Sequence, residues 1–271
     1  MRKNIKLVAI DLDGTLLNSE KRVSEKNFQI IKKLRDKGVF VVIATGRPVG
    51  GFYWILDDLD LNSNDDYSIT NTGSLIIKNK DKADISKEIL SMDDYFKLKK
   101  IINDDLQIGI YNKFNLYNNS EKINKYFLFE SKILKMPVEK FDEANKKQSV
   151  ERISIMGDRK IVDEFEKKYN KELLKTYQTV RNVPEVFEVL NKKADKGQAL
   201  ERLCKILNID IKSTLAIGDS NNDKSMLNLA GISATCSNGR EEVKKMSDLV
   251  SNYSNDEDGV FDILEKVFFG K

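Results

Sequence analysis

The feature that most constrains this sequence is a series of short apolar runs that contain no polar residue. Residues 7–10 and 39–44 are two such runs, and a polar residue follows each of them. Between them, apolar residues recur at helical spacing, with Ser24 as the predicted N-cap and Gly38 as the predicted C-cap. Unbroken apolar strands are typical of a parallel sheet with helices on both faces, and right-handed crossovers make such a sheet doubly wound.

This alternation of strands and helices stops near residue 82 and resumes near residue 189. The stretch between has alternating polar and apolar residues at 107–117 and a helical pattern at 158–169, which predicts antiparallel strands with helices. We therefore expect an α/β fold, with a doubly wound parallel (Rossmann-like) core and an inserted α+β domain. The predicted domains are 1–82 (first part of the core), 83–188 (insert) and 189–271 (second part of the core).

Within the insert, tyrosine and phenylalanine are frequent, as in the segment 126–129, and they are predicted to build its core. Arg152 and Glu185 are polar candidates for contact with a ligand. Each is nevertheless predicted to be an exposed surface residue, because charged side chains are rarely buried.

Acidic and basic residues nearly balance, since 46 Lys and Arg against 43 Asp and Glu leave a net charge of +3. A nucleic-acid binder would show a basic excess on one face, so no nucleic-acid partner is expected. No apolar run approaches the ~20 residues that span a bilayer, and the apolar part of the N-terminus is too short for a signal peptide. We expect a cytoplasmic protein with no membrane partner.

Histidine is absent from the chain. This excludes phosphotransfer through a histidine nucleophile, Ser-His-Asp triads and zinc sites with histidine ligands. The two cysteines, Cys204 and Cys236, lack the spacing of metal ligands and are predicted to be buried apolar residues. Catalysis must then depend on carboxylates, lysine, tyrosine, thiol or a metal ion, and oxygen ligands favour a hard ion such as Mg²⁺.

Polar residues follow the predicted core strands, at the edge where open parallel sheets bind their ligands. They are Asp11 and Asp13 after the first strand, Thr45 and Gly46 after the second, and Asp219, Asn222 and Asp223 after a later strand. Lys196, at the start of a predicted helix, is the nearest expected cation. Converging carboxylates repel one another in a partly dry site and need a divalent cation as counter-charge.

Their chemistry suits phosphate. Asp11 and Asp13, two residues apart on extended chain, are expected to point the same way. One can attack while the other handles a proton, provided that their surroundings separate their pKa values. The Thr45 hydroxyl and the Gly46 N–H can donate to phosphoryl oxygens, and a lysine stabilises their charge. Each motif alone has a plainer interpretation as a turn, a helix cap or a solvated side chain, but their order along the strands favours function.

Four segments carry a resemblance to a known family. They are Asp11-Leu12-Asp13-Gly14-Thr15-Leu16-Leu17, Ala44-Thr45-Gly46-Arg47-Pro48, Lys196-Gly197-x-Ala199-Leu200 and Gly218-Asp219-Ser220-Asn221-Asn222-Asp223-x-x-Met226-Leu227. In these segments the chain resembles the haloacid dehalogenase (HAD) superfamily, specifically the Cof-type phosphatases with a C2 (IIB-type) cap. The segment 255–260 is also similar to that family, and the insert falls where the family places its cap domain.

The resemblance implies an Mg²⁺-dependent hydrolase of small phosphomonoesters, of the sugar-phosphate or cofactor-phosphate class. Asp11 would be the nucleophile that forms an aspartyl-phosphate, and Asp13 would protonate the leaving group and then activate water. Asp11, the Asp13 backbone carbonyl and Asp219 would hold the metal, with Asp223 as a further ligand or a group just outside the ligands. The phosphoryl group would be bound by Thr45, Gly46, Lys196 and Asn222.

The chain departs from the family in two places, with Thr72-Gly73-Ser74 where Asn-Gly-Ala is usual and Cys236-Ser237-Asn238-Gly239 where Met-Gly-Asn-Ala is frequent. Two other functions stay open from the sequence. One is a phosphomutase on the same scaffold, and the other is a non-enzymatic signalling module that accepts a phosphoryl group. The expected partner is a small-molecule phosphate ester, and the expected assembly is a monomer or a small homo-oligomer.

Overall fold

The predicted parallel sheet forms from strands at both ends of the chain, in a computed structural model that describes residues 4–118, 120–141 and 149–270. Its order is β14-β13-β12-β1-β2-β3-β4-β5. The strands are β1 (Leu7–Ile10), β2 (Phe40–Ala44), β3 (Tyr67–Thr70), β4 (Leu75–Lys78), β5 (Asp84–Lys87), β12 (Thr214–Ile217), β13 (Ile232–Thr235) and β14 (Leu249–Val250). All pairs from β14 to β3 are parallel, and β4 is antiparallel to β3. The predicted doubly wound core is confirmed, and β4 extends it as an antiparallel strand beside β3.

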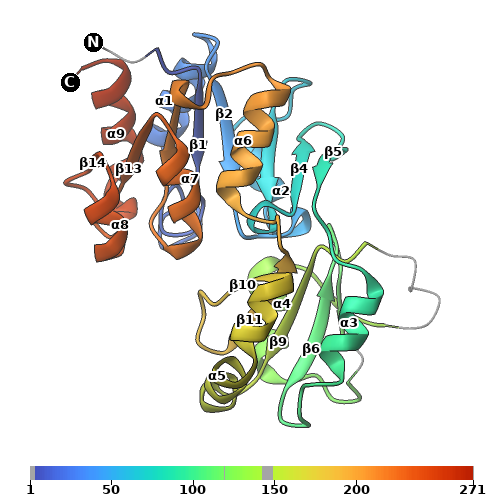
Figure 1. Cartoon of the computed structure of the whole chain (residues 1–271). Coiled ribbons are helices and arrows are strands. Elements are labelled where there is room, and N and C mark those ends of the chain that lie inside the picture. The colour runs from blue at the N-terminus through green and yellow to red at the C-terminus, as the bar shows by residue number, and fades with distance from the viewer. Residues whose placement is uncertain (1–3, 119, 142–148, 271) are drawn as a thin grey trace. The chain divides into compact units, whose positions relative to one another are not determined.

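Helices cover both faces of this sheet (Figure 1). They are α1 (Glu25–Arg35), α2 (Tyr53–Asp58), α6 (Lys196–Ile206), α7 (Lys224–Leu229), α8 (Glu241–Met246) and α9 (Gly259–Phe268). Apolar side chains of α6, α7 and α8 pack with β1, β2 and β12 in one cluster, whereas α1 contacts α9 and β2. Ser24 caps α1 as predicted, since its hydroxyl accepts from the backbone N–H of Asn27. The predicted glycine at the C-terminal end is confirmed. The N–H of Gly38, at φ +76°, donates to the carbonyl of Arg35 at 2.8 Å, and the next N–H donates to the carbonyl of Leu34 at 3.1 Å, which is a Schellman motif.

The insert forms a six-stranded sheet of its own, in the order β10-β11-β9-β6-β7-β8. Its elements are α3 (Met92–Lys99), β6 (Gln107–Tyr111), β7 (Leu116–Asn118), α4 (Lys125–Leu134), β8 (Val138–Lys140), β9 (Arg152–Met156), α5 (Arg159–Thr176), β10 (Tyr177–Val180) and β11 (Val186–Asn191). All its strand pairs are antiparallel except β7 with β8. Residues of α3 and α5 pack in one apolar cluster, and residues of α4 pack in another.

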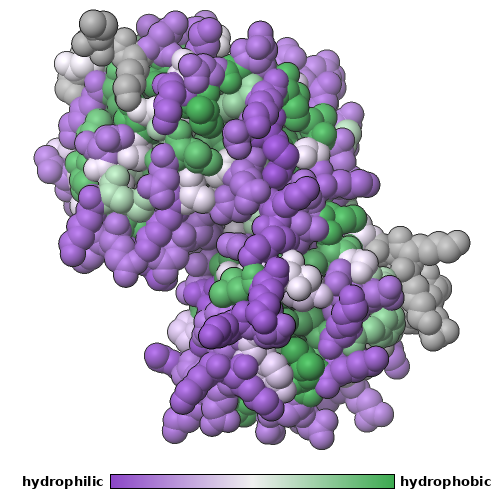
Figure 2. Space-filling model, viewed as in Figure 1, coloured by the Kyte–Doolittle hydropathy of each residue, from purple (hydrophilic) through white to green (hydrophobic). Residues whose placement is uncertain are grey.

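The chain divides into two compact units. The first unit consists of Met1–Gly46, Tyr53–Ser86 and Asp195–Lys271, and the second of Arg47–Phe52 and Lys87–Ala194. Hydrophilic residues predominate on the face shown in Figure 2. Among the described residues, no helix has both the length and the apolar character that crossing a bilayer requires.

Of two predictions about the insert, one is confirmed and one is wrong. Tyrosine and phenylalanine side chains do build its apolar core, among them Tyr95, Phe127 and Phe165, although Phe129 on the outer side of α4 is 66% exposed. Arg152 is buried instead of exposed, with its guanidinium 2.5 Å from Glu188 and 3.0 Å from Glu130. These two carboxylates supply the opposite charge that a buried arginine needs. Glu185 is half-buried.

Candidate active site

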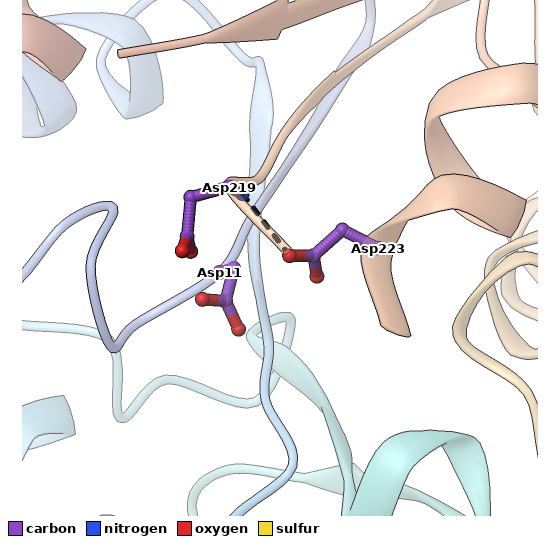
Figure 3. Close-up of side chains that lie close together, drawn as sticks. All are labelled: Asp11, Asp219 and Asp223. Atoms are coloured by element: carbon purple, nitrogen blue, oxygen red, sulfur yellow. Dashed lines mark hydrogen bonds between the residues drawn. The ribbon is translucent and has the colours of Figure 1, made fainter. Parts of the chain in front are cut away.

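Asp11 and Asp219 meet because they follow neighbouring strands. β1 pairs with β12 in parallel, with Ile10 beside Ile217, and the backbone N–H of Asp11 donates to the carbonyl of Ile217 at 2.9 Å. Asp223 comes from the short 3-10 turn Asn221–Asp223 that follows Asp219. Each of the three carboxylates offers an oxygen within 4.8 Å of the others, and Figure 3 shows the three side chains converging.

Backbone geometry fixes the Asp223 carboxylate in this cluster. One of its oxygens accepts from the N–H groups of Asp219, at 3.1 Å, and Ser220, at 3.0 Å. Gly218 makes this approach possible, because a Cβ at Gly218 would lie 2.6 Å from Cγ of Asp223. The position of the Asp223 carboxylate is therefore set by the main chain of the turn.

Thr15 holds the Asp219 carboxylate by a hydrogen bond. Its hydroxyl donates to Oδ1 of Asp219 at 3.0 Å, across 204 positions of sequence. Thr15 had no predicted role, although it stands in the run that follows the first strand. The only sequence signal was that run itself.

Lys196 is fully buried at the first turn of α6. Its ammonium nitrogen lies 2.6 Å from Oδ1 of Asp11 and 2.6 Å from Oδ1 of Asp223. Burial acts to lower the pKa of Lys196, but the two carboxylates together raise it above its ordinary value. Lys196 is therefore a permanent cation between two of the three acidic groups.

One lysine does not balance three carboxylates. Burial raises the pKa of Asp11 well above its ordinary value, against the attraction of Lys196, and the charges of Asp223 and Asp219 add to the rise. Burial and the charge of Asp223 likewise raise the pKa of Asp219 to about 6. Both pKa values rise because burial and the neighbouring negative charges disfavour the ionised carboxylates. An all-oxygen donor set with excess negative charge fits a hard divalent cation.

Asp13 has different surroundings from Asp11, and the chain that carries it does not stay extended. The backbone turns after β1, with Gly14 at φ +81° and the N–H of Thr15 donating to the carbonyl of Leu12. The half-exposed Asp13 carboxylate lies 2.8 Å from the ammonium group of Lys21. Among the described residues, the acidic cluster contains Asp11, Asp219 and Asp223 but not the Asp13 carboxylate.

The residues predicted to bind phosphate also gather in the first unit. Thr45 is buried after β2, and its N–H donates to the carbonyl of Ile69 at 2.9 Å. Gly46 follows it. The side-chain amide nitrogen of Asn222 lies 3.7 Å from the point that a Cβ would occupy on Gly46. The structure therefore brings Gly46 and Asn222 together from loops that are far apart in sequence.

Loops near the C-terminus hold the turn that carries Asp13. The Asn238 amide donates to the carbonyl of Gly14 at 2.8 Å, and the Asn255 amide donates to the carbonyl of Leu17 at 2.9 Å. The Asp256 carboxylate accepts from both the N–H and the hydroxyl of Ser19, each at 2.6 Å. The segment 255–260, which the resemblance singled out, thus contacts the loop that follows β1.

Comparison with known proteins gives a consistent result. The family described as haloacid dehalogenase-like hydrolase matches residues 8–264. Two proteins of Bacillus subtilis (strain 168), YcsE and YwtE, are each named 5-amino-6-(5-phospho-D-ribitylamino)uracil phosphatase. YcsE is 31% identical, over 95% of this chain and 93% of its own length. YwtE is 30% identical, over 98% of this chain and 99% of its own length.

Solved structures share the fold over the same extent. The crystal structure of a haloacid dehalogenase-like hydrolase from Bacteroides thetaiotaomicron has a TM-score of 0.88 and 27% identity, and covers 97% of this chain and 100% of its own. The HAD subclass IIB sugar phosphatase BT4131 has a TM-score of 0.78 and 22% identity, over 98% of this chain and 100% of its own. At the latter identity the likeness is one of fold.

Proposed function

Since the chain belongs to the haloacid dehalogenase-like hydrolases and is a phosphatase of that family, we propose that it hydrolyses small phosphomonoesters with Mg²⁺ through an aspartyl-phosphate on Asp11. The observation that carries this proposal is the position of the Asp11 carboxylate. It is buried, 2.6 Å from Lys196, and within 4.8 Å of oxygens of Asp219 and Asp223. A nucleophile for a phosphoryl group needs this combination of fixed position and nearby positive charge.

The carboxylates of Asp11 and Asp219 and the backbone carbonyl of Asp13 would hold the magnesium ion. Asp223 would either be a further ligand or hold the ligands in place, as its hydrogen bond with the N–H of Asp219 suggests. A bound Mg²⁺ supplies positive charge for the transferring phosphoryl group. Thr45, Gly46, Lys196 and Asn222 would bind the phosphoryl oxygens.

The reaction divides into two displacements at phosphorus. In the first, an oxygen of Asp11 forms a bond to phosphorus while the bond to the leaving oxygen breaks, and Asp13 donates its proton to that oxygen. In the second, Asp13 takes a proton from water, the water oxygen bonds to phosphorus, and the bond to Asp11 breaks. Asp13 is suited to this exchange because its carboxylate is half-exposed, whereas Asp11 is buried.

Two relatives support the proposed substrate class. Both are named for a phosphorylated ribityl compound, which supports small sugar-like or cofactor-like phosphate esters here. We also propose that 83–188 is an inserted α+β cap domain and that 1–82 and 189–271 form the core domain.

The test is the variant Asp11→Asn, assayed for Mg²⁺-dependent phosphate release from an aryl phosphate ester. We expect kcat to fall by at least about a thousandfold, because the nucleophile is lost, while the melting temperature stays within a few degrees or rises. Mass spectrometry of acid-quenched wild-type protein should detect a phosphorylated peptide that contains Asp11. The matched control is Asp36→Asn, an exposed carboxylate at the end of α1, which should keep full activity. Substantial turnover in Asp11→Asn would refute the assignment.

A further inference from the structure

Thr72 is a buried residue whose hydroxyl has no hydrogen-bond partner among the described residues. It lies in the 3-10 turn Asn71–Gly73 directly after β3, and the residue is 3% exposed. Buried hydroxyl groups nearly always have a partner, because an unsatisfied one loses its bonds to water without replacement. Burial of this hydroxyl therefore has a free-energy cost, and no hydrogen bond among the described residues offsets it.

The backbone of Thr72 adds a second unfavourable term. Its φ of +55° and ψ of 28° lie in the left-handed region, which a β-branched residue rarely adopts. Asparagine, the residue that the resemblance leads one to expect here, enters this region more easily. Unfavourable backbone conformations of this kind concentrate at binding and catalytic sites.

The turn is fixed from three directions, so its side chain cannot easily leave. The N–H of Thr72 donates to the carbonyl of Thr45 at 3.1 Å, and Arg202 donates to the carbonyl of Gly73 at 3.0 Å. Gly73 itself lies against the backbone of Asp195, with no room for a Cβ. The turn is thus joined to the loop that carries Thr45 and to the residue before Lys196.

The hydroxyl of Thr72 lies beside the residues that we assign to phosphate binding. Its oxygen is 3.4 Å from the point that a Cβ would occupy on Gly46, and the amide nitrogen of Asn222 is 3.7 Å from the same point. Because Gly46 has no side chain, two hydrogen-bond donors border one small space. A hydroxyl and an amide that face the same space are suited to oxygens with several lone pairs.

We propose that the Thr72 hydroxyl donates a hydrogen bond to a phosphoryl oxygen of the substrate, beside Gly46 and Asn222. The assignment rests on the proposed function, since it names an additional ligand of the same phosphoryl group. It accounts for both unfavourable terms, because the hydroxyl gains its partner only when phosphate is bound.

The test compares three variants for their affinity for inorganic phosphate in the presence of Mg²⁺, measured as the constant of product inhibition and as a thermal shift. Thr72→Val keeps the shape and removes the hydroxyl, and Thr72→Ser keeps the hydroxyl. Thr70→Val is the matched control, since Thr70 is also buried with an unpartnered hydroxyl, at the end of β3.

We expect Thr72→Val to bind phosphate about tenfold more weakly, which is typical for the loss of one hydrogen bond to a charged group. Without phosphate, it should melt at the wild-type temperature or above it. Thr72→Ser and Thr70→Val should bind phosphate as the wild type does.

Wild-type affinity in Thr72→Val, or a lower melting temperature of that variant without phosphate, would overturn the assignment and leave the proposed function intact. A wild-type protein that neither binds phosphate nor releases it from an ester would overturn both.

Discussion

The ammonium group of Lys196 and the carboxylate of Asp11 form an ion pair at 2.6 Å, although 185 residues separate them in sequence. Asp11 directly follows β1, an interior strand of the sheet, and Lys196 begins the helix that follows the insert. The side chain of Lys196 has no exposed surface. The proposed nucleophile and the cation beside it are therefore positioned by the packing of α6 on the sheet.

The first prediction concerns this lysine. Lys196→Met would leave the carboxylates of Asp11 and Asp223 buried without their cation, so we expect it to lower the free energy of unfolding by about 3–5 kcal/mol and to abolish phosphate release. Urea denaturation measures the first effect. The control is Lys205→Met near the other end of α6, whose side chain is 71% exposed, and its cost should stay within about 0.5 kcal/mol. Equal stability of the two variants would contradict the role of Lys196.

The second prediction concerns pH. Metal ligands must be deprotonated, so Mg²⁺ should raise the melting temperature more at about pH 8 than at about pH 5, because Asp219 has a pKa of about 6 and that of Asp11 is also raised. In metal-free protein, stability changes with pH in the opposite direction. A carboxyl group with a raised pKa stabilises the fold as pH falls through about 6, and the contribution is complete below the unfolded value of about 4.

Scanning fluorimetry at each pH measures both effects. Samples with Mg²⁺ give the rise in melting temperature on metal binding, and samples with a chelator give the pH dependence of the metal-free protein. Asp219→Asn should remove most of the Mg²⁺-dependent shift, whereas Asp36→Asn should retain it. If Mg²⁺ raised the melting temperature equally at both pH values, the carboxyl groups with raised pKa values would not take part in metal binding.

The third prediction compares two glycines in the left-handed region. Gly14 has φ +81°, and a Cβ there would lie 2.8 Å from Oδ2 of Asp219, whereas Gly38 has φ +76° and nothing within 4 Å. Alanine at either position should cost about 1 kcal/mol of stability through backbone strain. Gly14→Ala should in addition weaken Mg²⁺ binding by about 10- to 100-fold, since it displaces the carboxylate that we propose as a ligand. Metal titrations that give the same affinity for both variants would contradict this account.

The fourth prediction concerns the buried arginine of the insert. Arg152→Met would leave the carboxylates of Glu188 and Glu130 without their partner, and we expect the free energy of unfolding to fall by about 3–5 kcal/mol. Arg159→Met is the control, because Arg159 is 68% exposed and its ion pair with Asp163 is long, at 3.9 Å. A loss below about 1 kcal/mol for Arg152→Met would mean that the pair adds no more than a surface pair does.

The core was predictable because each apolar run ends at a polar residue, and parallel strands present those ends at one edge. This places Asp11 and Asp219 near each other before any coordinates are known. The sequence does not show that β12 is the direct neighbour of β1, which is what brings the two carboxylates within 4.8 Å.

The rest of the site depends on backbone turns and burial that no sequence pattern encodes. The turn that follows β1 places the Asp13 carboxylate beside Lys21, and the left-handed conformation of Thr72 follows from the contacts of its neighbours. Arg152 was misjudged because its burial requires two carboxylates from α4 and β11, which meet it only in three dimensions.

The contacts of Asn238, Asn255 and Asp256 with the loop after β1 also have a consequence for synthesis of the chain. Asp11 is synthesised long before β12, but β1 lies between β2 and β12, and the loop that follows β1 is held by residues 238–256. Domains fold as units during translation, so the packing around Asp11 is complete only after this later segment has left the ribosome. A nascent chain therefore cannot assemble the complete site until residues 238–256 have been made.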